Sequence, residues 1–469
     1  MKNSRQNDQR RLMMMNDPIP KVIFKMAIPT IIAFLINSIY SLADTYFVSD
    51  LGTQATAAVS VNASLDQLIM MTGSLLAVGA NSFIARLLGQ GDERKASRVL
   101  STAFFLALGL SLTLTVFGSI FITPMVNLLG ATDTCRQYSI EYASYVLLAA
   151  PFMATSFVMN QCLRSEGSAT LSMIGMGFGG ILNCILDPFF INGWSVIGLP
   201  AMGVAGASLA TAISKFISFC ILIFPYITKK SLLRLSIKNF RPTWEIVKEI
   251  ISIGSSSMFR SALAVVSAIL LNDLAGNISD SVLAGIGVSN KIMMFPFSII
   301  LGFGTGFQPV AGFNWGAKQY DRVKESYNFC SKVALIGSIA MAIVLALGAD
   351  WIIQLFGEED PALRELGALC IRLQCIALPI HAWVAVVNML CSGLGNAGGA
   401  LLLSNARQGS CMLPILYPMA WLWGEYGVVS VQAIADVLTL ALAVPLIIHM
   451  LKKISKTKLM YESGAMPDL

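Results

Sequence analysis

Long apolar stretches decide what this 469-residue chain can fold into. A helix needs about 20 apolar residues to cross the hydrocarbon core of a bilayer. About twelve stretches of that kind follow one another, near residues 25–48, 57–84, 99–123, 138–161, 168–190, 201–226, 252–274, 282–312, 332–355, 368–391, 399–421 and 428–450. Backbone groups that face lipid must be hydrogen-bonded within the segment, and these stretches are too long for barrel strands. The sequence therefore predicts an all-α integral membrane protein.

The composition supports this class and predicts an orientation. Hydrophobic residues make up 55% of the chain and charged residues 12%, against roughly a quarter charged in soluble domains. Lysine and arginine are concentrated in alternate connections, and the intervening connections carry only Arg136 and Arg364. This bias predicts a multi-pass protein of the inner or plasma membrane with both termini in the cytoplasm. The net charge of +6 reflects the same bias and does not indicate nucleic-acid binding.

The chain contains an internal repeat. A shift of 227 residues aligns Gly79 with Gly306 and Gly89 with Gly316. One further residue of offset aligns Pro151 with Pro379, Asn160 with Asn388 and Gly167 with Gly395. About six spans separate the copies, an even number, so both copies have the same orientation in the membrane. Such a parallel repeat is related by an axis along the membrane normal.

The repeat divides the chain into five regions. We expect a cytoplasmic N-terminal segment at 1–24, a first lobe at 25–226, a basic cytoplasmic linker at 227–247, a second lobe at 248–451 and a cytoplasmic tail at 452–469. Two pseudo-symmetric six-helix bundles around a midplane cavity suit alternating access, in which the bundles rock about a central site. We expect the protein to act as a monomer in the lipid bilayer.

Two isolated acids mark the first lobe as the candidate functional half. Asp187 lies in an otherwise apolar stretch, and Asp44 lies alone in the first predicted span. A carboxylate within a membrane span is costly, so by default it marks a functional site. Asn183 precedes Asp187 by four residues, which places its amide on the same helix face. Two acids that share one buried site titrate as a unit, so the pattern predicts an ion-coupling site.

Six motifs, in order along the chain, resemble those of a known family. They are Asp17-Pro18-Ile19-Pro20-Lys21, Ala43-Asp44-Thr45-Tyr46-Phe47-Val48, Leu163-Arg164-Ser165-Glu166-Gly167, Asn183-Cys184-Ile185-Leu186-Asp187-Pro188, Gly203-Val204-Ala205-Gly206-Ala207 and Gln308-Pro309-Val310-Ala311-Gly312-Phe313-Asn314-Trp315-Gly316-Ala317. Together they resemble the MATE (multidrug and toxic compound extrusion) family over essentially the whole chain. The resemblance implies twelve helices in two lobes, a V-shaped cavity, and drug export driven by inward flow of protons or sodium.

Within the family, the chain resembles the DinF-like/MepA-like branch, which couples through its N-terminal lobe. That resemblance implies an ion-coupling set of Asp44, Asn183 and Asp187, with Thr211 at a hydroxyl position of the sixth helix. The NorM-like branch has acids in the seventh and tenth helices. Here the seventh span has only Asp273, near its outer end, and the tenth has none.

The resemblance implies no cofactor apart from the coupling ion. We favour H+, whereas Na+ remains an alternative because the same four side chains offer oxygen ligands. In this hypothesis, protonation from outside neutralises the acid pair, repacks the first helix and releases the drug. Pro29 is a candidate hinge, because proline removes a backbone hydrogen bond.

Candidate substrate contacts are chosen by spacing and side-chain type. Asn37 lies seven residues before Asp44, and Met176 seven before Asn183, so each is two turns away on the same helix face. Tyr40, Gln67 and Asn160 add polar or aromatic groups. The 23 methionines suit a deformable lining. The expected partners are drugs or other toxic organic compounds, lipophilic and often cationic.

Other interpretations stay open beside the exporter. Most remaining ionisable residues within spans are expected to form ion pairs that lock helices together; these are Asp66, Lys215, Arg260, Asp273, Lys291 and Asp436. His381 is expected to be a packing residue. A flippase of a lipid-linked glycan, from a related superfamily, predicts a more basic cavity and usually additional spans. A membrane enzyme would need a reactive cluster, which the two histidines and nine cysteines do not provide, and their spacing predicts neither metal sites nor disulfides.

Overall fold

The computed structural model describes residues 2–49, 51–193, 200–354 and 361–463. Helices account for nearly all of this part of the chain, and no strand occurs in it. The helices are α1 (Lys2–Asn16), α2 (Ile19–Ser49), α3 (Thr53–Gln90), α4 (Glu93–Ile120), α5 (Ile122–Leu128), α6 (Arg136–Ser165), α7 (Ala169–Asn192), α8 (Gly203–Ile227), η2 (Ile237–Asn239), α9 (Trp244–Ile278), α10 (Asp280–Gly316), α11 (Tyr320–Gln354), α12 (Pro361–Gly393), α13 (Ala397–Asn405), η3 (Ala406–Ser410) and α14 (Met412–Glu462). The prediction of an all-α chain is confirmed.

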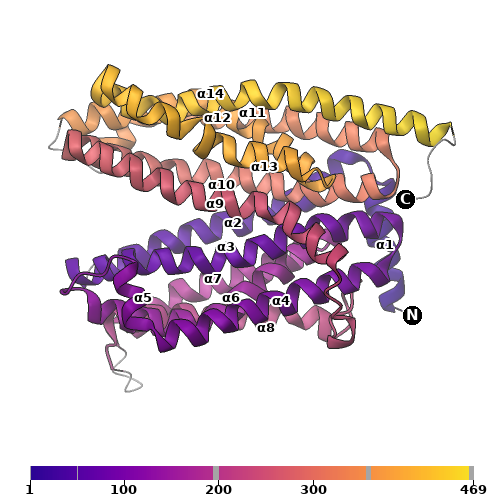
Figure 1. The fold of residues 1–469 in the computed structure, drawn as a ribbon, viewed down its shortest axis with the longest axis horizontal. Helices are drawn as coiled ribbons and strands as arrows, with labels where there is room; N and C mark the ends of the chain where they lie inside the picture. Colours follow the sequence, from indigo (N-terminus) through magenta and orange to yellow (C-terminus); the bar gives the residue numbers. More distant parts are fainter. Residues whose placement is uncertain (1, 50, 194–199, 355–360, 464–469) are drawn as a thin grey trace.

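Eleven helical segments within the described residues are long and apolar enough to cross a membrane. The last, Ala397–Glu462, has 66 residues and would extend about 100 Å if straight, three times the thickness of the hydrocarbon core. It turns at Gly424, whose φ of 55° and ψ of −129° suit glycine alone. Figure 1 shows the chain reversing direction within α14. This segment therefore contains both the eleventh and the twelfth predicted spans.

The two copies of the repeat form two bundles. Helices up to α8 occupy the lower part of Figure 1, and α9 to α14 occupy the upper part. The bundles meet through two equivalent helix pairs, because α2 packs against α10 and α3 packs against α9. In each pair, the first helix of one copy contacts the second helix of the other, as expected for two copies related by an approximate two-fold axis.

The contact between α3 and α10 shows this symmetry residue by residue. A Cβ atom at Gly89 would lie 2.1 Å from the Phe313 carbonyl oxygen, and one at Gly316 would lie 2.0 Å from that of Arg86. Gly316 and Phe313 are the residues 227 positions after Gly89 and Arg86. Any side chain at either glycine would clash with backbone, so the close crossing requires glycine at both.

The basic segments lie together at one end of the molecule, which we call the basic end. It contains α1, the connection between α3 and α4, the connection between α8 and α9, and the end of α14 (Figure 1). Contacts confirm the grouping: Arg10 donates a hydrogen bond to the Lys230 carbonyl at 3.3 Å, and Lys458 forms an ion pair with Asp321 at 2.7 Å.

The two bundles are joined firmly at the basic end. Arg86 of α3 forms an ion pair with Glu249 of α9 at 2.5 Å. Arg322 of α11 donates to the carbonyl oxygens of Asp17 at 2.9 Å and Met14 at 3.3 Å. Exposed or partly exposed ion pairs contribute only about 1 kcal/mol or less each, so apolar packing accounts for most of this closure.

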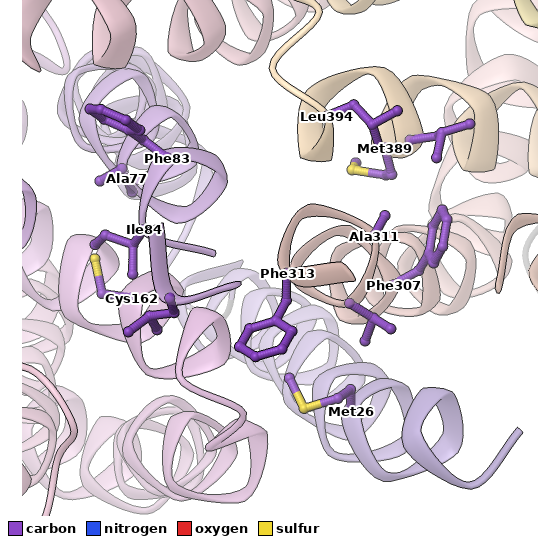
Figure 2. Close-up of a cluster of buried hydrophobic side chains, with 14 of the residues drawn as sticks. Met26, Ala77, Phe83, Ile84, Cys162, Phe307, Ala311, Phe313, Met389 and Leu394 are labelled. Atoms are coloured by element: carbon purple, nitrogen blue, oxygen red, sulfur yellow. The ribbon is translucent and has the colours of Figure 1, made fainter. Parts of the chain in front are cut away.

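A buried apolar cluster supplies that packing. It includes side chains of α2, α3 and α6 from the first bundle and of α10 and α12 from the second. Figure 2 shows part of it, with Ala77 and Phe83 of α3, Phe307 and Phe313 of α10, and Met389 of α12. Because both bundles contribute, separating them at this end would expose apolar surface that is now buried.

Candidate functional site

The predicted Asn183, Asp187 and Thr211 lie together between α7 and α8. The Asn183 amide donates hydrogen bonds to Asp187 Oδ1 at 3.1 Å and to Thr211 Oγ1 at 3.2 Å. Asp187 is 0% exposed and Asn183 2%. The four-residue spacing explains the first bond, because it stacks the two side chains one helical turn apart. The second bond depends on the close packing of α7 against α8.

Asp44 of α2 faces the same group. Its carboxylate is half-buried and interacts electrostatically with Asp187 and with Lys215 of α8. The approach of α2 to α7 is close, since a Cβ at Gly180 would lie 3.0 Å from an Ile36 methyl carbon. The structure therefore brings all four predicted ion-coupling residues into one cluster.

Two members of this cluster were not among the predicted coupling residues. Asp66 of α3 interacts electrostatically with both Lys215 and Asp44. Lys215 donates a hydrogen bond to the Tyr40 hydroxyl at 3.4 Å and lies 4.8 Å from the centre of its ring. We call Asp44, Asp66, Asp187, Asn183, Thr211 and Lys215 the acid cluster.

The sequence contains a signal for one of the two. Lys215 follows Thr211 by four residues, so a helical α8 places both on one face. No spacing relates Asp66 to the other members, because it is placed there by the packing of α3 against α2 and of both α3 and α8 against α6. Both residues were expected to form ion pairs, yet no carboxylate of the described residues lies within 4 Å of the Lys215 amine.

Several oxygen atoms of the acid cluster are shielded from solvent and lack a hydrogen-bond partner within the described residues. They are Asp44 Oδ1, Asp66 Oδ1, Asp187 Oδ2 and Asn183 Oδ1. Buried acceptors without partners are costly, and one lysine against three carboxylates leaves two negative charges uncompensated. The arrangement is therefore suited to bind a proton or another small cation. No group of three or more His, Cys, Asp or Glu side chains in the described segments is placed to hold a metal ion.

A separate cavity of about 510 Å³, the central chamber, lies mainly in the second bundle. Gln67 of α3 is the one predicted substrate residue that lines it. Asn160 lies instead in a packed network near the C-terminal end of α6. Its amide donates to the Ser172 carbonyl at 3.0 Å, and its oxygen accepts from Arg164. Asn37, Tyr40 and Met176 are half-buried and do not line the chamber.

The second bundle contains a direct ion pair between a buried and a half-buried side chain, unlike the acid cluster of the first. Arg407 of η3 forms an ion pair with Asp436 of α14, with Nε 2.6 Å from Oδ1, and His381 lies 3.9 Å from the same oxygen. The expected pairing of Asp436 is thus confirmed. Arg260 was also expected to pair, but its guanidinium donates to Ser257 Oγ at 3.1 Å, and no carboxylate of the described residues lies within ion-pair distance of it.

Two related helical bundles, a buried acid cluster in one of them and a chamber beside it are the features of a multi-pass membrane transporter. The chain belongs to the MatE family: the model of that family, described as MatE, matches residues 29–189 and again residues 256–417. The two matches begin 227 residues apart, which is the offset of the internal repeat.

The chain is similar to curated multidrug export proteins named MepA. It is 28% identical to that of Staphylococcus saprophyticus over 434 residues, which covers 92% of this chain and 94% of the relative. It is also 28% identical to that of Staphylococcus aureus strain NCTC 8325, covering 93% and 94% of the two chains. These relatives agree with the resemblance to the MepA-like branch.

Solved structures show the same fold. A multidrug resistance MATE family transporter in an outward-facing conformation superposes with a TM-score of 0.88 at 24% identity, covering 95% of this chain and 98% of the other. A MATE crystal structure in a bent conformation superposes with a TM-score of 0.87 at 24% identity, covering 96% and 99%.

Proposed function

We propose that this protein is a multidrug efflux antiporter, which exports lipophilic small molecules in exchange for an inward-moving cation. The acid cluster carries the proposal, because it groups one buried and two half-buried carboxylates with a single lysine. Such a group is unstable with all its carboxylates ionised and is stabilised when a cation binds. The MepA relatives are named multidrug export proteins, which supports the proposal that this chain exports several drugs.

A proton fits the acid cluster better than sodium. Sodium needs several oxygen ligands around one point, and the ammonium of Lys215 lies within electrostatic reach of Asp44 and Asp66. A sodium ion bound beside that ammonium would be repelled by its positive charge. A proton needs no ligand shell, since it binds one carboxylate oxygen directly. We therefore assign the coupling ion as H+.

In the proposed cycle, protonation weakens the repulsion between Asp44 and Asp187 and allows α2 to repack against α7. Pro29 of α2 has no amide hydrogen, and the neighbouring Thr30 hydroxyl bonds the Met26 carbonyl at 2.8 Å, so this turn is a suitable hinge. One charge that crosses 100 mV provides about 2.3 kcal/mol. That energy biases two states by roughly fortyfold, which is enough for a modest drug gradient.

The basic end is assigned to the cytoplasm, with both chain termini there, because basic loops remain on that side of a membrane. The bundles are joined at this end by Arg86–Glu249 and by the apolar cluster. We therefore interpret the structure as an outward-facing state. Opening toward the cytoplasm would have to break these contacts.

The deciding experiment measures efflux of a panel of lipophilic dyes from proteoliposomes, with pH and sodium gradients imposed separately. We expect an inward proton gradient to drive efflux and a sodium gradient at equal pH to have no effect. Efflux driven by sodium alone would reassign the ion, and no ion-driven efflux of any dye would refute the antiporter.

A flippase of a lipid-linked glycan is the second candidate, because the charged residues of the central chamber are basic. A pyrophosphate carries several charges, however, and Arg407 is already paired with Asp436. That leaves Arg260 as the unpaired guanidinium of the chamber lining, which is too little for such a headgroup. Movement of a fluorescent lipid-linked sugar across vesicles without an ion gradient would favour the flippase.

A further inference from the structure

The central chamber has a charge of the opposite sign to the acid cluster. Its lining includes Arg260, Arg407 and His381, and no lining residue of the described chain is an aspartate or glutamate. Asp436, the partner of Arg407, is 4% exposed and does not line the chamber. A cation that enters this space meets guanidinium groups without a facing carboxylate.

Arg260 is the group with unused bonding capacity. Of its five N–H donors, one is directed to Ser257 Oγ. The side chain is half-buried in the chamber wall. The low polarity of these surroundings strengthens its electrostatic attraction for an opposite charge. An unpaired guanidinium in such a place attracts a planar anion, and a carboxylate matches its paired donors.

Neighbouring amides on the same wall also lack partners. Gln374 Oε1, Gln408 Oε1 and Gln432 Nε2 are buried without a hydrogen bond in the described chain, and all three residues line the chamber. Gln374 is only 5% exposed. Buried amides normally find partners. Gln432 Nε2 could donate to an anionic group, and the two oxygens could accept from donors on the same ligand or from water.

The rest of the chamber is suited to an apolar body. Phe297, Leu271 and Val428 line it, and the Arg407 guanidinium lies 4.7 Å from the centre of the Phe297 ring. A volume of about 510 Å³ is that of a site for a drug-sized molecule.

We propose that the central chamber binds amphiphilic molecules that carry a carboxylate or similar planar anionic group, with the anion on Arg260 and the apolar body against Phe297. This inference rests on the proposed export function and specifies its substrate class. It also revises the expectation of cationic cargo, because a purely cationic molecule gains nothing from this lining. A zwitterion meets the requirement as long as its anionic group reaches Arg260.

The test uses two dyes that differ in one group. Rhodamine B has a free carboxylate, and its ethyl ester has the same ring system without it. Binding to the purified transporter in phosphatidylcholine nanodiscs is followed by fluorescence anisotropy, with empty nanodiscs subtracted. We expect the acid to bind about tenfold more tightly than the ester, as a charge-assisted hydrogen bond predicts. Arg260→Gln should remove that preference, so that the acid and the ester bind with similar affinity, whereas Arg260→Lys should retain part of it.

Arg372→Gln is the matched control, because Arg372 lies on the same bundle but is exposed and paired with Asp350. It should behave as the wild type. The wild-type comparison needs no variant, so misfolding of Arg260→Gln would not obscure the result. Equal binding of acid and ester, or tighter binding of the ester, would overturn the inference and leave the export function standing. Binding of neither dye would count against both.

Discussion

The two bundles have the same fold but differ in their charged groups. In the first bundle, Lys215 interacts electrostatically with Asp44 and Asp66, and Asp44 with Asp187, without a direct ion pair in the described chain. In the second, Asp436 is paired with Arg407. The positions that match Asp44 and Asp187 in the repeat are Leu271 and Ile415, so the second bundle has no equivalent acids. In the function proposed above, duplication thus provides two scaffolds, of which one serves cation coupling and the other contact with cargo.

The largest expected effect comes from the centre of the acid cluster. Asp187→Asn removes the titratable group but preserves its size and its hydrogen bond from Asn183. We expect it to abolish drug resistance in a pump-deficient host while the protein remains in the membrane at normal abundance. Asp273→Asn, an exposed acid of α9, should leave resistance intact. Full resistance with Asp187→Asn would remove this residue from the coupling mechanism.

Asp44→Asn should have a large but smaller effect. It removes the electrostatic interaction of α2 with Asp187, while Asp187 itself remains able to bind a proton. We expect ion-driven counterflow in proteoliposomes to fall by about tenfold, equivalent to 1.4 kcal/mol of lost coupling. Unaltered counterflow would show that Asp44 has no part in coupling.

In the second bundle, removal of an acid should affect stability rather than coupling. Asp436→Asn leaves Arg407 without its partner in a half-buried site, and such a change costs about 3 kcal/mol. We expect a lower melting temperature in a detergent-based thermal assay. Replacing both members of the pair with apolar residues of similar size should restore most of the stability. If Asp187→Asn lowered the melting temperature as much as Asp436→Asn, the contrast between the bundles would fail.

The last expected effect, a change in the pH dependence of stability, concerns Glu166. This residue lies just beyond the end of α6, and its counterpart in the second bundle is Leu394. Burial raises the pKa of this carboxyl to about 7, although hydrogen bonds from Ser231 and the Leu232 amide act in the opposite direction. The pKa of this group in the folded protein is above its unfolded value of 4.5. Its contribution to the free energy of unfolding is therefore greatest below pH 4.5 and falls as pH rises toward 7.

Glu166→Gln should therefore flatten the dependence of melting temperature on pH between 5 and 8. The expected gain in the free energy of unfolding at pH 8 is at most about 3 kcal/mol, as the pKa shift implies. Melting curves of wild type and variant at several pH values are the measurement. Parallel curves for the two proteins would exclude Glu166 as the titrating group.

The amino-acid sequence alone determined the helices, the repeat and the alignment of Asn183 with Asp187. These features depend on the length of apolar stretches and on spacing within one helix, both of which are local. The sequence also indicated the correct family, because its motifs keep their order and spacing along the chain.

Tertiary structure decided which helix faces meet. Asp66 and Lys215 join the acid cluster only because α2 contacts both α3 and α8, which each pack on α6. Asn160 is placed in a packed network away from the chamber. Helical periodicity shows which residues share a face, but it contains no information on the neighbour of that face. For the same reason, the pairing of Arg407 with Asp436 and the unpaired position of Arg260 in the chamber wall follow from the packed bundle and not from the order of residues.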